Sequence, residues 1–117
     1  MKIMLSQLDT VRQALIAATA SGYDSKNVFH YYAFDRTPPY IVWAEDNEYA
    51  SVEADNHKVN QTIEGTIDLF TKNEEDPLID GIQDALNNAC ISFRVNTVDY
   101  EEETEFIHWE WVWQVSI

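Results

Sequence analysis

The end of the chain constrains the fold more than any other segment. From residue 107 to residue 117, every second position is apolar, and the positions between are mostly polar. This period of two is typical of a β-strand with one apolar face. The apolar positions are Ile107, Trp109, Trp111, Trp113, Val115 and Ile117. Each indole buries on the order of 150–250 Å². The sequence therefore predicts a sheet whose tryptophan face is covered by helices or by another subunit.

Other segments supply partners for this strand. Residues 91–97 alternate in the same way, and the acidic run Glu101, Glu102 and Glu103 separates them from the last strand, so we expect a hairpin with an acidic tip. Residues 59–69 (VNQTIEGTIDL) predict a strand with one apolar and one polar side. A further strand over residues 28–34 would end before Thr37-Pro38-Pro39, because proline removes a backbone donor.

The middle of the chain predicts a short strand, a turn and a weak edge. The run YIVWA at residues 40–44 is nearly all apolar, which favours a strand buried on both faces. Glu45, Asp46 and Glu48 form a polar group with Asn47 that indicates a turn. Residues 49–54 then return as a weak edge strand.

Two amphipathic helices complete the pattern. The first has apolar residues at steps of three and four, from Met4 to Ala18, and is expected to end at Ser21-Gly22. The second begins at an Asp76 cap followed by Pro77 and extends to Asn88. The element order is α-β-(β)-β-α-β-β. This predicts a single domain over residues 1–117 of the α+β class, with an antiparallel or mixed sheet of about four to five strands and both helices packed on one face.

Charge restricts the partners. The chain has 21 acidic and 7 basic residues and a net charge of −14, so its mean field repels phosphate backbones and anionic lipids. We therefore predict neither sequence-specific nucleic-acid binding nor a membrane partner, and no stretch approaches the ~20 apolar residues of a membrane span. Cys90 is the single cysteine, which leaves no internal disulfide.

No motif predicts an enzyme or a cofactor. The nucleophile, phosphate-loop and zinc-protease motifs are missing, and His30, His57 and His108 lie on separate predicted elements. The acidic groups Glu45/Asp46/Glu48 and Glu101–Glu103 lack the spacing of a calcium loop, so we predict no metal site there. They are instead candidate interface or lumen loops. The aromatics Trp43, Trp109, Trp111 and Trp113 are candidates either for the core or for a face buried on oligomerisation.

Four segments together resemble a known family. They are PPYIVW at residues 38–43, VNQTIEGTIDLFTK at 59–72, the helix from Asp76, and the closing ISFRV…FIHWEWVWQV hairpin. In order and spacing the chain resembles the tail terminator, or tail completion, proteins of long-tailed bacteriophages and prophages. The resemblance implies a structural protein that forms a ring, typically hexameric, caps the tail tube and ends its elongation.

The same resemblance implies the partners and the location. These are other copies of the chain, the tail-tube protein and a head-completion or connector protein, met in the host cytoplasm during assembly and in the tail or neck of the virion. Two other interpretations stay open. One is a small acidic DNA mimic that inhibits a host nuclease or restriction enzyme, and the other is a neighbouring head-completion connector subunit.

Overall fold

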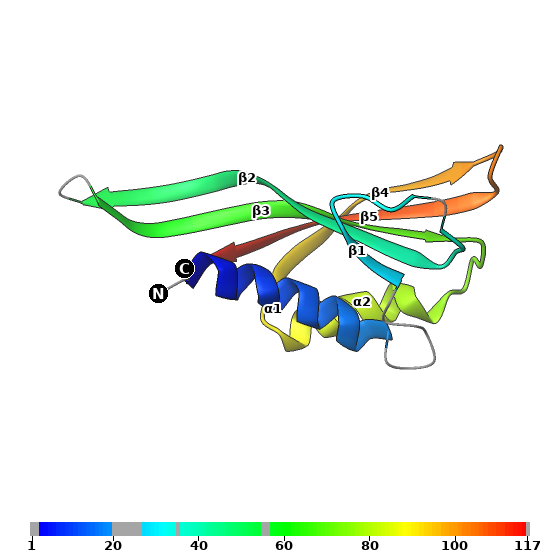
Figure 1. The fold of residues 1–117 in the computed structure, drawn as a ribbon, viewed down its shortest axis with the longest axis horizontal. Coiled ribbons are helices and arrows are strands. Elements are labelled where there is room, and N and C mark those ends of the chain that lie inside the picture. Colours follow the sequence, from blue (N-terminus) through cyan, green and yellow to red (C-terminus); the bar gives the residue numbers. More distant parts are fainter. Residues whose placement is uncertain (1–2, 20–26, 35, 55–56, 117) are drawn as a thin grey trace.

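A five-stranded mixed sheet and two helices make up the computed structural model, which describes residues 3–19, 27–34, 36–54 and 57–116. The elements are α1 (Ile3–Ala18), β1 (Val28–His30), β2 (Tyr40–Ala54), β3 (His57–Thr71), α2 (Pro77–Asn88), β4 (Ser92–Glu101) and β5 (Phe106–Ser116). The strand order is β1-β2-β3-β5-β4, and only the β1–β2 pair is parallel. Both helices lie on the same side of the sheet (Figure 1). The predicted α+β class and element order are confirmed.

The tryptophan face of β5 forms the centre of the core. Trp111 and Trp113 are fully buried, and Trp43 of β2 is 3% exposed, while Trp109 is only partly buried at the margin. The indole nitrogen of Trp111 donates a hydrogen bond to Gln83 Oε1 on α2 at 3.1 Å. The sequence allowed this face to be either core or a contact with another subunit. The helices of the same chain cover most of it.

A glycine on β3 makes room for one of these rings. Gly65 is the register partner of Trp113, and a Cβ placed on it would lie 2.5 Å from Trp113 Cζ2 and 2.0 Å from the carbonyl oxygen of Ala44. Trp113 also donates a hydrogen bond to the Thr66 carbonyl oxygen at 3.0 Å. The ring therefore packs flat against the β3 backbone, which a side chain at residue 65 would prevent.

The connection from β3 to α2 is fixed by a buried polar pair. Asp76 Oδ1 accepts a hydrogen bond from the Leu78 amide at 2.9 Å, which confirms the predicted helix cap. Its other oxygen accepts one from Thr71 Oγ1 at 2.6 Å, and both side chains are buried. The end of β3 thereby sets where α2 begins and how it crosses the sheet.

The predicted turn at Glu45, Asp46 and Glu48 is wrong. β2 is continuous through these residues and pairs with β3 from Tyr40 to Ala54, with irregularities at 45/47, 48/50 and 52/53. Bulges admit extra residues without ending a ladder, so a polar run can lie within a long strand. The strand at 40–44 is also not buried on both faces, because Ile41 and Trp43 are buried while the residues between them are only half-buried.

The segment at 28–34 is shorter as a strand than predicted. β1 ends at His30, and Tyr31 has a φ of 75°, which takes the backbone out of the extended conformation. Two expectations lie outside the described residues, namely the end of the first helix at Ser21-Gly22 and the side-chain direction of Val59. In the described part of the chain, neither helix combines the length and apolarity needed to cross a membrane.

The molecule is elongated. It measures 53 × 26 × 23 Å, and its radius of gyration of 15.2 Å exceeds the roughly 13 Å expected of a compact chain of this length. A strand of 15 residues extends about 50 Å, so β2 and β3 set the long axis. The β2–β3 hairpin extends past the helices at one end and the β4–β5 hairpin at the other (Figure 1).

Replacing Gly65 tests the packing of the central tryptophan. We expect Gly65→Ala to lower the free energy of unfolding by about 3 kcal/mol, because the added methyl group meets backbone and an indole that have no room to move. The matched control is Gly81→Ala in α2, where the nearest atom is the Ala18 carbonyl oxygen at 3.4 Å. There we expect a gain of up to about 1 kcal/mol from helix propensity. Urea unfolding followed by tryptophan fluorescence measures both, and equal values for the two variants would contradict this account.

Candidate functional site

The sheet face away from the helices, here called the outer face, contains the most concentrated group of interacting polar side chains. On β3 it presents Asp68 and Phe70, and on β5 it presents His108 and Glu110. The register pairs Asp68 with Glu110 and Phe70 with His108. Residues 38 and 42 positions apart in sequence therefore meet on adjacent strands.

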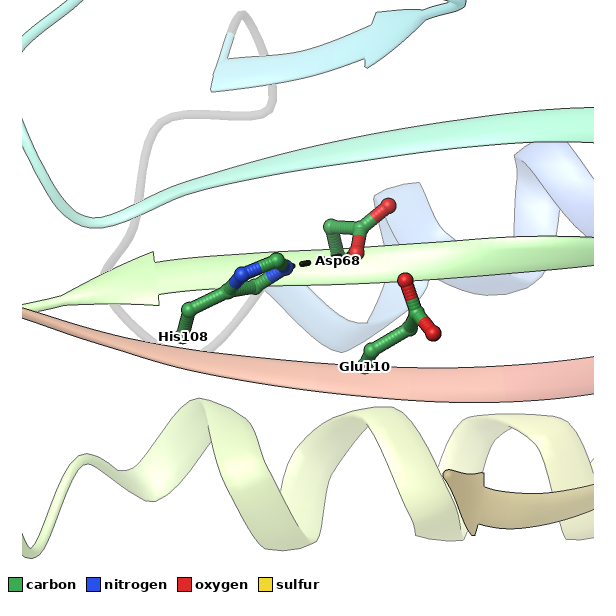
Figure 2. A group of neighbouring side chains, drawn as sticks. All are labelled: Asp68, His108 and Glu110. Carbon is green, nitrogen blue, oxygen red and sulfur yellow. Dashed lines mark hydrogen bonds and ion pairs between the residues drawn. The ribbon is translucent and has the colours of Figure 1, made fainter. Parts of the chain in front are cut away.

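Asp68, His108 and Glu110 form a compact cluster, here called the outer-face cluster. His108 Nε2 lies 2.6 Å from Asp68 Oδ1, and one ligand-type atom from each of the three residues lies within 4.8 Å of the other two. Figure 2 shows the three side chains on the same side of β3 and β5, with the Glu110 carboxylate beside that of Asp68. All three are half-buried.

The orientation of each member is supported by neighbours. The His108 ring stacks on Phe70 with 4.3 Å between ring centroids, and Glu110 Oε1 accepts a hydrogen bond from Asn96 Nδ2 at 2.7 Å. The hydrogen bond from His108 to Asp68 raises the pKa of the imidazole, and this effect outweighs the burial that lowers it. The cluster is therefore suited to holding a positive charge at His108 or between the carboxylates.

An aromatic row lies beside this cluster on the outer face. Phe29, Tyr40, Phe70 and Phe106 come from β1, β2, β3 and β5 in spatial order. Tyr40 stacks on Phe70 at 4.9 Å between centroids, and Phe29 and Phe106 meet Tyr40 edge-on at 6.4 and 6.3 Å. Four rings in contact on an uncovered sheet face make a contiguous apolar surface.

Two cations flank the aromatic row. The Arg36 guanidinium lies 4.7 Å from the centre of the Phe29 ring, and Lys72 Nζ lies 5.7 Å from that of Phe106. In a chain with only 7 basic residues, two of them therefore border one apolar surface. Each end of the row thus has a basic side chain against an aromatic ring.

A pocket opens where the segment after β1 approaches the row. Its volume is about 330 Å³, and its walls include Tyr31, Tyr32, Tyr40 and Phe70, together with His108 of the outer-face cluster. Tyr32 is 77% exposed, and Phe34 in the same segment is 80% exposed. Because Tyr32 lines the same pocket as Tyr40 and Phe70, its exposed ring extends the apolar surface of the row, and a grouped apolar surface favours contact with another molecule.

The predicted acidic loop residues of β2 have separate roles. Glu45 accepts hydrogen bonds from the Tyr31 hydroxyl and from His30 Nε2, the latter at 2.7 Å, and the His30 ring stacks on Trp43. Burial raises the pKa of the Glu45 carboxyl, but the hydrogen bonds from Tyr31 and His30 lower it by more, so the net shift is downward. Glu45 on β2 thus holds the end of β1 and the residue after it in place through these two hydrogen bonds.

The other predicted acidic residues lie apart from this contact. Burial and then the nearby Asp68 and Glu64 raise the pKa of Asp46, which is therefore electrostatically close to the outer-face cluster. Glu48 accepts a hydrogen bond from the Gln61 side-chain amide. Glu101 ends β4, and Glu102 and Glu103 lie exposed in the turn before β5. The structure thus keeps the second acidic group at a hairpin tip, as predicted, and does not bring it together with the first.

Comparison of the sequence with models of known protein families finds no matching family. Comparison with curated proteins finds no matching relative either.

Sequence reasoning missed the outer-face cluster. The alternation assigned Asp68 to the polar side of one strand and His108 and Glu110 to the polar side of another, but His108 was treated as a lone histidine. The missing information was the register between β3 and β5, which no local pattern contains. The aromatic row was missed for the same reason, because each strand contributes a single ring.

Acid should weaken the contact made by Glu45. A carboxyl with a lowered pKa in the folded state stabilises the protein above its unfolded-state pKa, and this stabilisation is lost as the pH falls through the folded-state value. We therefore expect the unfolding free energy of wild type at pH 7 to exceed that of Glu45→Gln by less than about 1 kcal/mol, because solvent screens the interaction. This difference should disappear below about pH 4. Chemical unfolding across pH 3–7 measures it, with Glu102→Gln at the exposed turn as control. A margin that grows on acidification would contradict the assignment.

Proposed function

We propose that this chain is a structural assembly subunit of a long-tailed phage or prophage, which closes with copies of itself into a ring that caps the tail tube and joins it to the head. The single observation that supports this best is the half-buried aromatic row on the face opposite the helices, with the exposed Tyr32 and Phe34 in the segment beside it. An apolar surface of this kind on a strongly charged small domain favours protein–protein contact.

Charge makes another copy of the same chain a suitable partner. Each copy has a net charge of −14, so subunits repel one another unless their contacts exclude most carboxylates. The aromatic row is flanked by Arg36 and Lys72, which attract the acidic surface of a neighbour. A contact from this row to the acidic remainder of the next copy is heterologous, and heterologous contacts form a ring when the rotation between successive copies closes.

The elongated shape fits the same proposal. The hairpins β2–β3 and β4–β5 extend in opposite directions past the helices (Figure 1). In the proposed ring, each hairpin would contact a different neighbour. β4 is an edge strand, and Val95, Val98 and Tyr100 on it are between 42% and 61% exposed. Exposed apolar residues on an edge strand favour pairing with another chain.

The proposed function is mechanical and involves no covalent chemistry. The same surfaces would serve a head-completion connector subunit, which differs only in its neighbours. A DNA-mimicking inhibitor is less well supported, since the aromatic row interrupts the carboxylates of the outer face and phosphate mimicry needs them regularly spaced.

Self-association should strengthen with ionic strength. We expect the mass of the purified chain, measured by light scattering after size exclusion, to rise toward a closed ring between 50 and 500 mM NaCl, because salt screens the mutual repulsion of the subunits. Phe34→Asp should reduce association at every salt concentration. Its control is Thr37→Asp, which adds the same charge at another exposed position of the same segment and removes no aromatic side chain. A ring that dissociates as salt rises, or equal loss in both variants, would contradict the proposal.

Tail length tests the capping role directly. Added to tail-tube protein during polymerisation, the chain should stop growth, and electron microscopy of particles assembled without it should show over-long tubes. The Phe34→Asp variant should leave tubes uncapped, whereas Thr37→Asp should cap them. Tubes of normal, fixed length in the absence of the protein would defeat the assignment, and capture of a DNA-processing enzyme from host lysate would favour the mimic.

A further inference from the structure

We propose that Asp68, His108 and Glu110 form a binding site for one divalent transition-metal ion, with Zn²⁺ as the probe. The sequence predicted no metal site, and the two acidic groups that it singled out are not the residues involved. This inference concerns the isolated chain and does not depend on ring formation or tail capping.

The donor set suits such an ion. One imidazole nitrogen and two carboxylate oxygens lie within 4.8 Å of one another, and in Figure 2 they project from adjacent strands on the same side of the sheet. Zinc bonds to these atoms at about 2.0–2.2 Å, which separates neighbouring ligand atoms by roughly 3–4 Å. Side-chain rotation would have to open the 2.6 Å contact between His108 Nε2 and Asp68 Oδ1 and to shorten any separation that lies between about 4 Å and 4.8 Å. Three protein ligands leave further positions for water or for a partner's side chain.

The scaffold that positions these atoms is rigid. Asp68 and Glu110 are directly paired across two central strands, and His108 is two residues from Glu110 on the same strand, hence on the same face. Phe70 stacks against the imidazole, and Asn96 holds one oxygen of Glu110. Ligands already restrained in this way lose little further freedom when they bind a metal.

Electrostatics supply an independent argument. Like charges directly opposite each other on adjacent strands destabilise a sheet, yet Asp68 faces Glu110 and both are half-buried. Asp46 adds to the same negative region, as its interaction with Asp68 shows. Among the ion pairs of the described residues, Asp68 meets only His108, and neither Asp68 nor Glu110 meets a lysine or an arginine. A divalent cation would offset this repulsion with two charges, where a protonated His108 supplies one, and would displace that proton on binding.

The imidazole favours a transition metal over Mg²⁺ or Ca²⁺. Those harder cations prefer all-oxygen sites, with six or more ligands in the case of Ca²⁺. Nitrogen ligation by histidine suits Zn²⁺ and its neighbours in the first transition row. Preference for Zn²⁺ over Mg²⁺ would therefore distinguish a specific site that includes His108 from nonspecific screening of carboxylates by divalent cations.

Calorimetry of the untagged, EDTA-treated chain with ZnCl₂ at pH 7 tests the proposal. We expect one equivalent of Zn²⁺ per chain, an affinity at least about tenfold lower in Glu110→Gln, and a greater loss in His108→Gln. Two controls should keep wild-type affinity. Glu64→Gln removes the same charge from the same face, about 13 Å further along β3, and His30→Gln removes the histidine of the rival His30–Glu45 pair.

Thermal unfolding and competition with Mg²⁺ provide two further measurements. At equal concentration, Zn²⁺ should raise the thermal midpoint of wild type and of both controls by more than that of Glu110→Gln or His108→Gln, and millimolar Mg²⁺ should not displace it. Circular dichroism checks that each variant is folded. If one of the two ligand variants does not fold, the other still tests the site. Equal weakening by Glu64→Gln, displacement by Mg²⁺, or unchanged affinity in a folded ligand variant would overturn the proposal. None of these results bears on whether the chain forms a ring.

Discussion

The pairing of β3 with β5 is the constraint on which the rest of the structure depends. Trp113 lies flat on Gly65, and this contact fixes which residues of the two strands face each other. The register places the tryptophans against the helices, and the same register assembles the opposite face. A slip of one residue would expose the indoles and separate Asp68 from His108 and Glu110. Core and candidate site are therefore two consequences of one alignment.

In the described residues both helices lie on one face of the sheet, which leaves the other face without a helix over it. The open face combines features that are costly in an isolated monomer, namely a row of aromatic rings across four strands and two carboxylates placed opposite each other. Contact with another chain would relieve the first, and a bound cation would relieve the second. The ring proposal and the metal proposal each account for one of these features, and each can fail without the other.

Much of the fold could be predicted from local pattern. The alternation in β5, the cap at Asp76 and the apolar periodicity of both helices identified the elements and the α+β class. The error at Glu45–Glu48 arose because a polar run is typical of a turn, whereas here bulges retain it within a strand of 15 residues. Residues 46–48 of β2 are exposed, so their side chains need not be apolar, and periodicity loses its signal there.

The sequence by itself determined which residues lie on which side of each strand, because side-chain direction follows from a period of two that the chain contains locally. Only the tertiary structure decided which strands are neighbours and in what register, because that choice depends on packing between residues far apart in the chain. Trp109, Trp111 and Trp113 could be assigned to one apolar face from their spacing alone. That His108 meets Asp68, 40 residues earlier, could not, since nothing near either residue specifies the other.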